Sequence, residues 1–129
     1  MTFQYAPAPE STAIVNINSS NDLFINGEFT PGHGNPFKTI NPATEEVLAE
    51  IAHANEEDGN AAVMAARKAY DKTWSKMSGR DRGKYLFRIA RLIQERSREL
   101  AVLETLDNGK PIRESRDVDI PIAAAHFFY

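Results

Sequence analysis

Residues 104–111 read Glu-Thr-Leu-Asp-Asn-Gly-Lys-Pro, and this stretch marks where one helix ends. Leu106 closes an apolar series at helical spacing. Asn108-Gly109 then supplies residues that tolerate a left-handed backbone, and Pro111 cannot continue a helix. Together these signals predict a helix C-terminus at Asn108-Gly109.

Two helices are predicted upstream of this end. Asn55 is an N-cap candidate for a helix that runs to Trp74, and three acids occupy its first turn, where the helix dipole favours them. Ser78 is an N-cap candidate for a second helix, which carries apolar residues along one face. We expect Ser97 to break or re-cap this second helix before it reaches residues 104–111.

A third helix is predicted downstream, beginning near Ser115–Asp119 and continuing to Tyr129, with Pro121 tolerated in its first turn. The sequence stops on Phe-Phe-Tyr without a Gly, a basic last turn or a polar tail. Because these are the usual signals that end a helix, we expect the chain to be a fragment cut within a helix.

The first half of the chain has the signals of strands and tight turns. Residues 23–25 and 28–30 flank Asn26-Gly27, which predicts a β-hairpin with a type I′ turn. Short strands are predicted over 37–41 and 46–54, after a Gly/Pro loop at 31–36 and on either side of a turn at 42–45.

These elements predict an α/β fold, in which an N-terminal β-hairpin and strands are followed by three helices. Residues 1–21 are rich in Ala, Pro, Ser and Asn, a composition that does not repay the entropy of ordering. We therefore expect a flexible N-terminal arm over residues 1–21 and a structured part over residues 22–129.

Composition excludes several classes of protein. The 129 residues include 15 Lys plus Arg, 18 Asp plus Glu and no Cys, and the net charge is −3. Without Cys there is no disulfide, thiolate metal site or cysteine nucleophile in this chain. No stretch has the apolar length of a signal peptide or a membrane span, so we expect a cytoplasmic protein without a membrane partner.

The sequence offers no catalytic constellation. His33, His53 and His126 lie far apart and lack neighbouring ligands at metal-binding spacing, so we interpret them as surface or core histidines. Gly-rich phosphate turns and the Gly-x-Ser-x-Gly nucleophile motif are absent. We assign no catalytic residue and no cofactor-binding residue to this chain.

Positive charge is concentrated in residues 76–98, where eight Lys and Arg residues outnumber Asp81 and Glu95. Lys84, Arg88 and Arg91 share one face of the predicted second helix. This face is either a solvated or interdomain surface, or a site through which a stand-alone α+β interaction module binds nucleic acid or an acidic partner. The face lacks aromatic residues on which bases could stack, which favours the first interpretation, so we do not expect nucleic acid as a partner.

Asp107 is the most informative acid. It lies at the C-terminal end of a predicted helix, where backbone carbonyls lack partners and negative potential accumulates. A carboxylate beside these oxygens could bind a hard cation, or it could instead cap nearby backbone N–H groups. The residues alone leave both interpretations open.

Residues 104–111 resemble a motif of the aldehyde dehydrogenase superfamily. Other strings match that family in the same order: residues 23–29, residues 39–48, an Ala-rich helix that ends at Trp74, and residues 80–92. The resemblance covers residues 22–129. It implies that the chain is an N-terminal part of the aldehyde dehydrogenase fold that packs on the Rossmann-like cofactor domain.

The resemblance also implies an activity. Members of the family oxidise an aldehyde substrate to a carboxylic acid with NAD or NADP. Their catalytic Cys and Glu and their cofactor-binding residues follow the segment matched here, so we expect this fragment to be inactive alone. A homodimer or homotetramer is expected for the full-length enzyme.

Three site residues follow from the resemblance. Some family members bind a monovalent cation, K⁺ or Na⁺, through the segment that matches residues 39–42 and the aspartate that matches Asp107, so Ile40 and Asp107 are candidate metal ligands. The helix from Val118 onward resembles the family helix beside the aldehyde entrance tunnel, which makes Ile122 a candidate tunnel residue. Pro121 departs from the residues usual in that helix.

Overall fold

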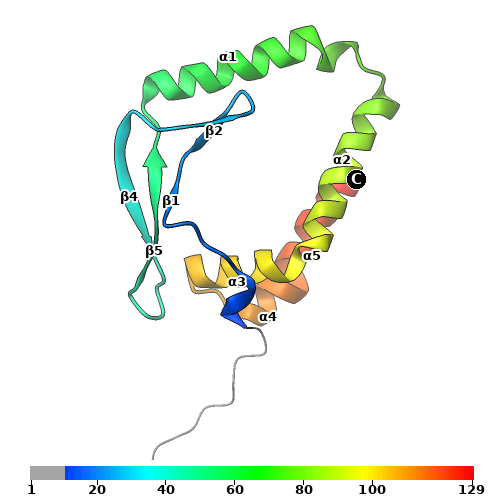
Figure 1. The fold of residues 1–129 in the computed structure, drawn as a ribbon. Helices are drawn as coiled ribbons and strands as arrows, with labels where there is room; N and C mark the ends of the chain where they lie inside the picture. The colour runs from blue at the N-terminus through cyan, green and yellow to red at the C-terminus, as the bar shows by residue number, and fades with distance from the viewer. Residues whose placement is uncertain (1–10) are drawn as a thin grey trace, which may run out of the picture.

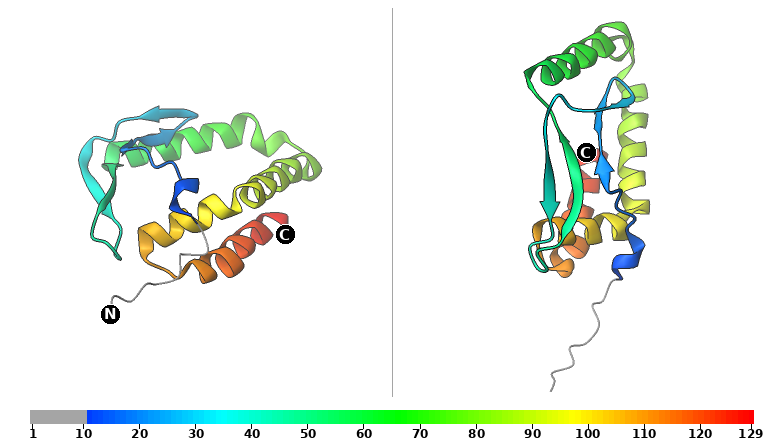
Figure 2. Two further views of the ribbon diagram at one scale, coloured as in Figure 1. Left: turned by 60° about the horizontal axis from the view of Figure 1, so that its bottom comes forward. Right: turned by 60° about the vertical axis from the view of Figure 1, so that its left-hand side comes forward.

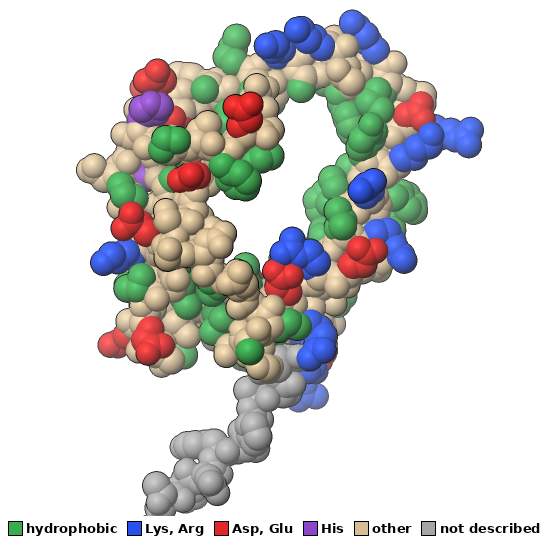
Figure 3. All heavy atoms as spheres, viewed as in Figure 1, with side chains coloured by type: hydrophobic (Ala, Val, Ile, Leu, Met, Phe, Trp, Pro, Cys, Tyr) green, Lys and Arg blue, Asp and Glu red, His purple; other side chains and the backbone are tan. Residues whose placement is uncertain are grey.

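The computed structural model describes residues 11–129, which form strands and helices around an open ring. In Figure 1 the strands lie on one side of this ring, α1 (Glu56–Lys72) crosses the top, α2 (Gly79–Glu95) runs down the other side and α3 (Ser97–Asn108) lies across the bottom. The space-filling view in Figure 3 shows an opening through the middle of the molecule. The α/β class and the order of strands before helices are confirmed.

The strands form two separate sheets. In the three-stranded sheet β5 is central, pairing in parallel with β1 and antiparallel with β4. The other sheet is the β2–β3 hairpin. The bounds are η1 (Thr12–Ile14), β1 (Ser20–Asn21), β2 (Leu23–Ile25), β3 (Glu28–Thr30), β4 (Gly34–Ile40) and β5 (Val47–His53).

The predicted hairpin is confirmed. Ile25 pairs with Glu28 across the two-residue turn, in which Asn26 and Gly27 have φ values of 56° and 88°. Both are positive, as a type I′ turn requires. The turn chemistry therefore sets the register of the hairpin.

The predicted flexible arm, residues 1–21, is described only in part. Residues 1–10 of that arm lie outside the described residues. Within the remainder, Thr12–Ile14 forms a 3₁₀ turn capped by the Ser11 side chain, and Ser20–Asn21 forms β1. Backbone pairing of β1 with β5 stabilises this polar segment, and local composition carries no signal for a partner so distant in sequence.

Strand β4 is longer than predicted. It begins at Gly34 instead of Phe37, although Pro36 cannot donate a backbone hydrogen bond. The strand tolerates proline because it lies at the edge of the sheet, and its register shifts between Gly34 and Phe37. The predicted strand at 46–54 corresponds to β5.

The first two helices begin where the sequence predicts. The Asn55 side chain accepts a hydrogen bond from the backbone N–H of Asp58 at the start of α1 (Glu56–Lys72), and the Ser78 hydroxyl accepts one from Asp81 at the start of α2 (Gly79–Glu95). Helix α1 ends two residues before Trp74, which begins the 3₁₀ turn η2 (Trp74–Lys76).

The predicted break after α2 is confirmed, but Ser97 does not cap the next helix. Arg96 is the residue between α2 and α3 (Ser97–Asn108), and Ser97 is already helical. Arg96 donates two hydrogen bonds to the carboxylate of Glu99 in the first turn of α3. This side-chain contact holds the two helices at their junction.

The third predicted helix is built from three segments, namely α4 (Ile112–Glu114), a π-helical turn η3 (Ser115–Asp119) and α5 (Ile120–Phe128). In the π turn the N–H of Ile120 reaches back to the carbonyl of Ser115. The next residue, Pro121, has no N–H to donate. The wider turn accommodates the proline without ending the helix.

Helices α2 and α5 lie side by side (Figure 2), and the Phe87 and Phe128 rings meet edge-on with centroids 5.1 Å apart. Among the described residues the fully buried apolar side chains are small, and most are alanines. Many large apolar side chains stay exposed, Phe87 among them. The buried apolar residues are Ala49, Ala90, Ala101, Val102 and Ala124.

Candidate functional site

The end of β4 meets the end of α3. The Thr39 hydroxyl donates a hydrogen bond to the Asp107 carboxylate, although the two residues are 68 positions apart in the sequence. Asp107 is in the last turn of α3, whose final carbonyl groups have no partner within the helix. The fold therefore places a carboxylate and a set of backbone oxygens beside the strand that contains Ile40.

A glycine permits this junction. Gly109 follows α3 with φ 76°, and its N–H donates to the carbonyl of Thr105 at 3.0 Å. A Cβ atom built at Gly109 would lie 2.7 Å from Cγ of Pro42, which is closer than two carbon atoms can approach. The left-handed backbone and the contact with Pro42 both require glycine.

The turn after β4 is held by Asn41, which is buried. Its side-chain oxygen accepts the N–H of Ala43 at 2.9 Å, and its backbone N–H donates to the carbonyl of Glu46 at 2.9 Å. Glu45 completes the turn at φ 61°. These contacts fix the backbone on which the carbonyl of Ile40 lies.

The structure thus brings the two predicted cation-binding segments together. Thr39, next to Ile40, contacts Asp107 directly, and both Ile40 and Asp107 are exposed at the surface. Residues 11–129 contain no group of three His, Cys, Asp or Glu side chains that could hold a metal ion. A cation at this junction would depend on backbone oxygens together with one carboxylate.

The candidate tunnel residue lies elsewhere. Ile122 is in α5, with its side chain about half exposed, and Val118 is exposed one turn earlier in η3.

Sequence reasoning missed the most strongly perturbed carboxylate. Asp58 is 5% exposed and accepts three hydrogen bonds, from the backbone N–H of His33 at 2.9 Å, from the backbone N–H of Asn55 at 3.0 Å, and from the His33 ring at 2.6 Å. These donors lower the pKa of Asp58 to about 2. The hydrogen bond and charge of Asp58 raise the pKa of His33. The Asn55-x-x-Asp58 spacing could have revealed the capping box, whereas nothing local links His33 to it.

The basic face of residues 76–98 is partly neutralised within the chain. Lys84 pairs with Asp81 at 2.7 Å, and Arg96 pairs with Glu99. Figure 3 shows Lys and Arg side chains spread along α2 beside acidic ones. These contacts give no support to the alternative of a nucleic-acid-binding module.

Among residues 11–129, no helix combines the length and the apolar character that crossing a membrane demands.

The fold is a set of short strands followed by helices, with the Thr39–Asp107 junction joining the two parts, and comparison with known proteins shows its family. The family model for the aldehyde dehydrogenase family matches residues 29–129. This chain belongs to the aldehyde dehydrogenase family.

Individual relatives agree. Aldehyde dehydrogenase 1 of Tanacetum cinerariifolium is 48% identical over 109 residues, which cover 83% of this chain and 22% of that protein. Aldehyde dehydrogenase [NAD(P)+] 2 of Saccharomyces cerevisiae is 48% identical over 99 residues, covering 76% of this chain and 20% of that protein.

A solved structure matches in three dimensions. The NAD+ complex of aldehyde dehydrogenase from Bacillus cereus superposes with a TM-score of 0.83 at 44% identity, covering 88% of this chain and 23% of that one. The chain corresponds to an N-terminal portion of the family fold and spans about a quarter or less of these relatives.

Proposed function

We propose that this chain is the N-terminal segment of an NAD(P)-dependent aldehyde dehydrogenase, which oxidises an aldehyde to a carboxylic acid. The family match over residues 29–129 carries this proposal. Yeast and Bacillus cereus relatives that are named for NAD(P)+ or contain NAD+ support the cofactor class. The chain supplies scaffold, because it contains no Cys to attack an aldehyde.

The start of α1 does not fit the pyrophosphate of a dinucleotide. A pyrophosphate is commonly bound at a helix N-terminus that follows a strand through a Gly-rich turn. Here β5 leads into α1 without glycine, and the α1 N-terminus is occupied by the Asp58 carboxylate beside two further acids, Glu56 and Glu57. These charges repel phosphate, so the start of α1 is not a site for the cofactor's pyrophosphate.

A direct test is to express the longer protein that contains this chain and to follow aldehyde-dependent NAD(P) reduction by absorbance. We expect turnover by the longer protein and none by residues 1–129 alone. If the longer protein fails to reduce NAD(P) with a panel of aliphatic and aromatic aldehydes, the proposal is wrong. Turnover by residues 1–129 would contradict the assignment of the reacting groups to other parts of the enzyme.

A monovalent cation, Na⁺ or K⁺, is proposed at the carbonyl of Ile40 and at Asp107. Support comes from the Thr39 hydroxyl, which holds one carboxylate oxygen of Asp107 and leaves the other for a ligand. Thermal unfolding of the longer protein in Na⁺ or K⁺ should occur at higher temperature than in choline at equal ionic strength. Asp107→Asn should remove this difference, and an unchanged difference would overturn the assignment.

Ile122 is proposed to line the route by which the aldehyde reaches the reaction centre. Its half-exposed position on α5 leaves the side chain available to a neighbouring surface. Ile122→Trp should raise KM for bulky aldehydes more than for acetaldehyde, with kcat for acetaldehyde nearly unchanged. Equal effects on both substrates would argue against a tunnel position.

We also propose that the longer protein is a cytoplasmic homodimer or homotetramer. The wide exposure of large apolar side chains in this segment supports assembly against further surfaces. Sedimentation analysis of the longer protein and fluorescence microscopy of a tagged copy in cells test the two parts separately.

A further inference from the structure

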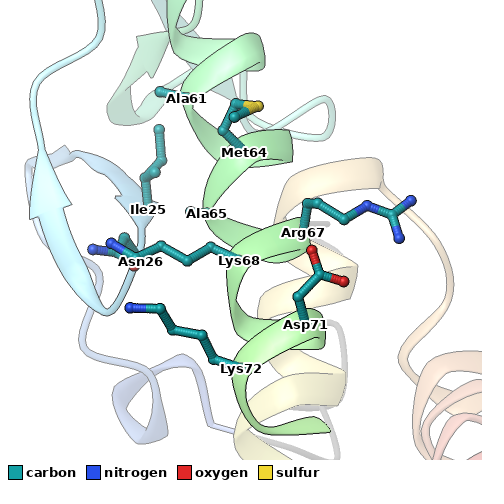
Figure 4. A pocket seen from close by; sticks show the side chains of 9 residues that line it. All are labelled: Ile25, Asn26, Ala61, Met64, Ala65, Arg67, Lys68, Asp71 and Lys72. Atoms are coloured by element: carbon teal, nitrogen blue, oxygen red, sulfur yellow. The ribbon is translucent and has the colours of Figure 1, made fainter. Parts of the chain in front are cut away.

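A cavity of about 660 Å³ opens between the tip of the β2–β3 hairpin and α1. Figure 4 shows side chains of α1 along one side of it and the hairpin tip along the other. Its volume falls within the range typical of small-molecule sites, roughly 300–1,000 Å³. The residues that line it are Ile25, Asn26, Ala61, Met64, Ala65, Arg67, Lys68, Asp71 and Lys72.

One wall of this pocket is apolar. Ile25 of the hairpin faces the small side chains of Ala61 and Ala65, whereas Met64 lies on the side of α1 where Arg67 points. Alanines at these positions let the hairpin tip approach the helix while leaving open space around it.

The opposite end of the pocket is cationic. Figure 4 shows the Lys68 and Lys72 side chains both reaching toward Asn26 at the hairpin tip, whereas Arg67 and Asp71 point to the other side of the helix. Arg67 also packs over the Tyr70 ring, 5.7 Å from its centroid.

Within the described part of the chain, neither Lys68 nor Lys72 forms a salt bridge. Two lysines four residues apart lie on the same face of a helix and repel each other. An anion held between the two ammonium groups would remove this repulsion. The arrangement therefore favours a negatively charged ligand over a neutral or cationic one.

We propose that this pocket binds a small organic phosphate monoester. Lys68, Lys72 and the side-chain amide of Asn26 supply donors for the three terminal phosphate oxygens. The two ammonium groups match the phosphate charge of about −2 at neutral pH. The organic part of the ligand lies against Ile25, Ala61 and Ala65.

This assignment is independent of aldehyde oxidation. None of the pocket residues belongs to the Thr39–Asp107 junction, and Ile122 is not among them. A phosphate ligand here would act at a second site, distinct from both.

The test uses the longer protein, saturated with NAD so that phosphate sites for the cofactor are occupied, and titrates it with phenyl phosphate by calorimetry. We expect phenyl phosphate to bind more tightly than inorganic phosphate, and phenol to show no binding at this site. Lys68→Gln and Lys72→Gln should each weaken binding about threefold, and the double variant about tenfold.

Two further variants separate the parts of the site. Ile25→Ala should weaken the binding of phenyl phosphate without affecting the binding of inorganic phosphate, because it removes only apolar contact. Lys38→Gln is the matched control, since Lys38 is exposed on β4 outside the pocket, and it should bind like the wild type. Circular dichroism confirms that each variant is folded.

The pH dependence gives an independent readout. Binding should weaken between pH 7.5 and pH 5.5, because the second phosphate pKa of about 6 lies in this interval and the ligand loses charge. Absence of binding, wild-type affinity in the Lys68→Gln/Lys72→Gln variant, or equal affinity for phenol would each overturn the proposal.

Discussion

Asp58 connects two segments that are distant in sequence. Its carboxylate receives the N–H of Asn55 at the start of α1 and both the backbone and the ring of His33 in the loop before β4. The same loop is pressed against β5, since a Cβ at Gly32 would lie 2.3 Å from the carbonyl oxygen of His53. One acid thereby fixes the β3–β4 loop against the first helix.

The His33–Asp58 pair predicts a pH optimum of stability. The pKa of His33 is raised in the folded protein. Its contribution to the free energy of unfolding is therefore fully present below the unfolded pKa of 6.5 and is lost as pH rises through the higher folded pKa. The pKa of Asp58 is lowered to about 2. Its contribution to the free energy of unfolding is therefore present above about pH 4 and is lost as pH falls toward 2. Thermal unfolding temperatures measured from pH 3 to pH 8.5 should be highest between about pH 4 and 6.5.

His33→Gln should flatten the decrease in unfolding temperature above pH 6.5. The substitution removes the titrating ring and keeps the backbone N–H that donates a hydrogen bond to Asp58. His126→Gln is the matched control, since His126 is exposed on α5. An identical pH profile for the wild type and His33→Gln would refute the role given to this pair.

Gly109 leads to a second prediction at this scale. Gly109→Ala should destabilise the protein by about 2 kcal/mol, because alanine disfavours the left-handed backbone and its Cβ meets Pro42. Chemical denaturation measures the change. Gly59→Ala should instead stabilise the protein, because Gly59 is helical and has open space around its Cβ position. An unchanged free energy of unfolding for Gly109→Ala would contradict the requirement for glycine beside Pro42.

The helices show how local signals determine elements. Asn55 and Ser78 each accept a backbone N–H three residues further along, where the sequence places the caps, and Asn108-Gly109 ends α3. The π turn before Pro121 and the parallel pairing of β1 were not predictable in the same way. The first is a response of backbone hydrogen bonding to a missing donor, and the second depends on a partner about thirty residues away.

The cap of α2 is testable alone. The Ser78 hydroxyl accepts the N–H of Asp81 at 3.1 Å and donates to its carboxylate at 2.7 Å. Ser78→Ala should destabilise the protein by about 1 kcal/mol, measured by denaturant unfolding. Ser75→Ala, at an exposed serine of η2, should change stability much less. Equal effects of the two substitutions would rule out a capping contribution.

At the scale of the whole molecule, the candidate site was only partly predictable. The family resemblance placed Ile40 and Asp107 at a cation site, and the structure shows that their segments meet through Thr39. The His33–Asp58 contact and the hairpin–α1 pocket join parts of the chain whose local sequence carries no mark of the other. Such contacts arise from the tertiary fold, so a single sequence without its relatives does not reveal them.

The distribution of apolar surface leads to a further prediction. Within residues 11–129 the buried apolar residues are four alanines and one valine, while Phe24, Phe29, Phe37 and Phe87 are each more than half exposed. Residues 1–129 alone should bind a hydrophobic fluorescent dye several-fold more strongly, per mole, than the longer protein. Light scattering should show self-association of residues 1–129 that rises with salt. Weak dye binding and a monomer at high salt would contradict this view of the exposed faces.

The parallel pairing of β1 with β5 has a consequence for synthesis on the ribosome. Ser20 pairs with Glu50, so β1 emerges long before its partner exists, whereas the β2–β3 hairpin is complete by Thr30 and can form at once. The nascent chain therefore carries an unpaired strand edge until His53 has left the exit tunnel. During that interval the order of translation, more than the final contacts, decides which neighbours β1 meets first.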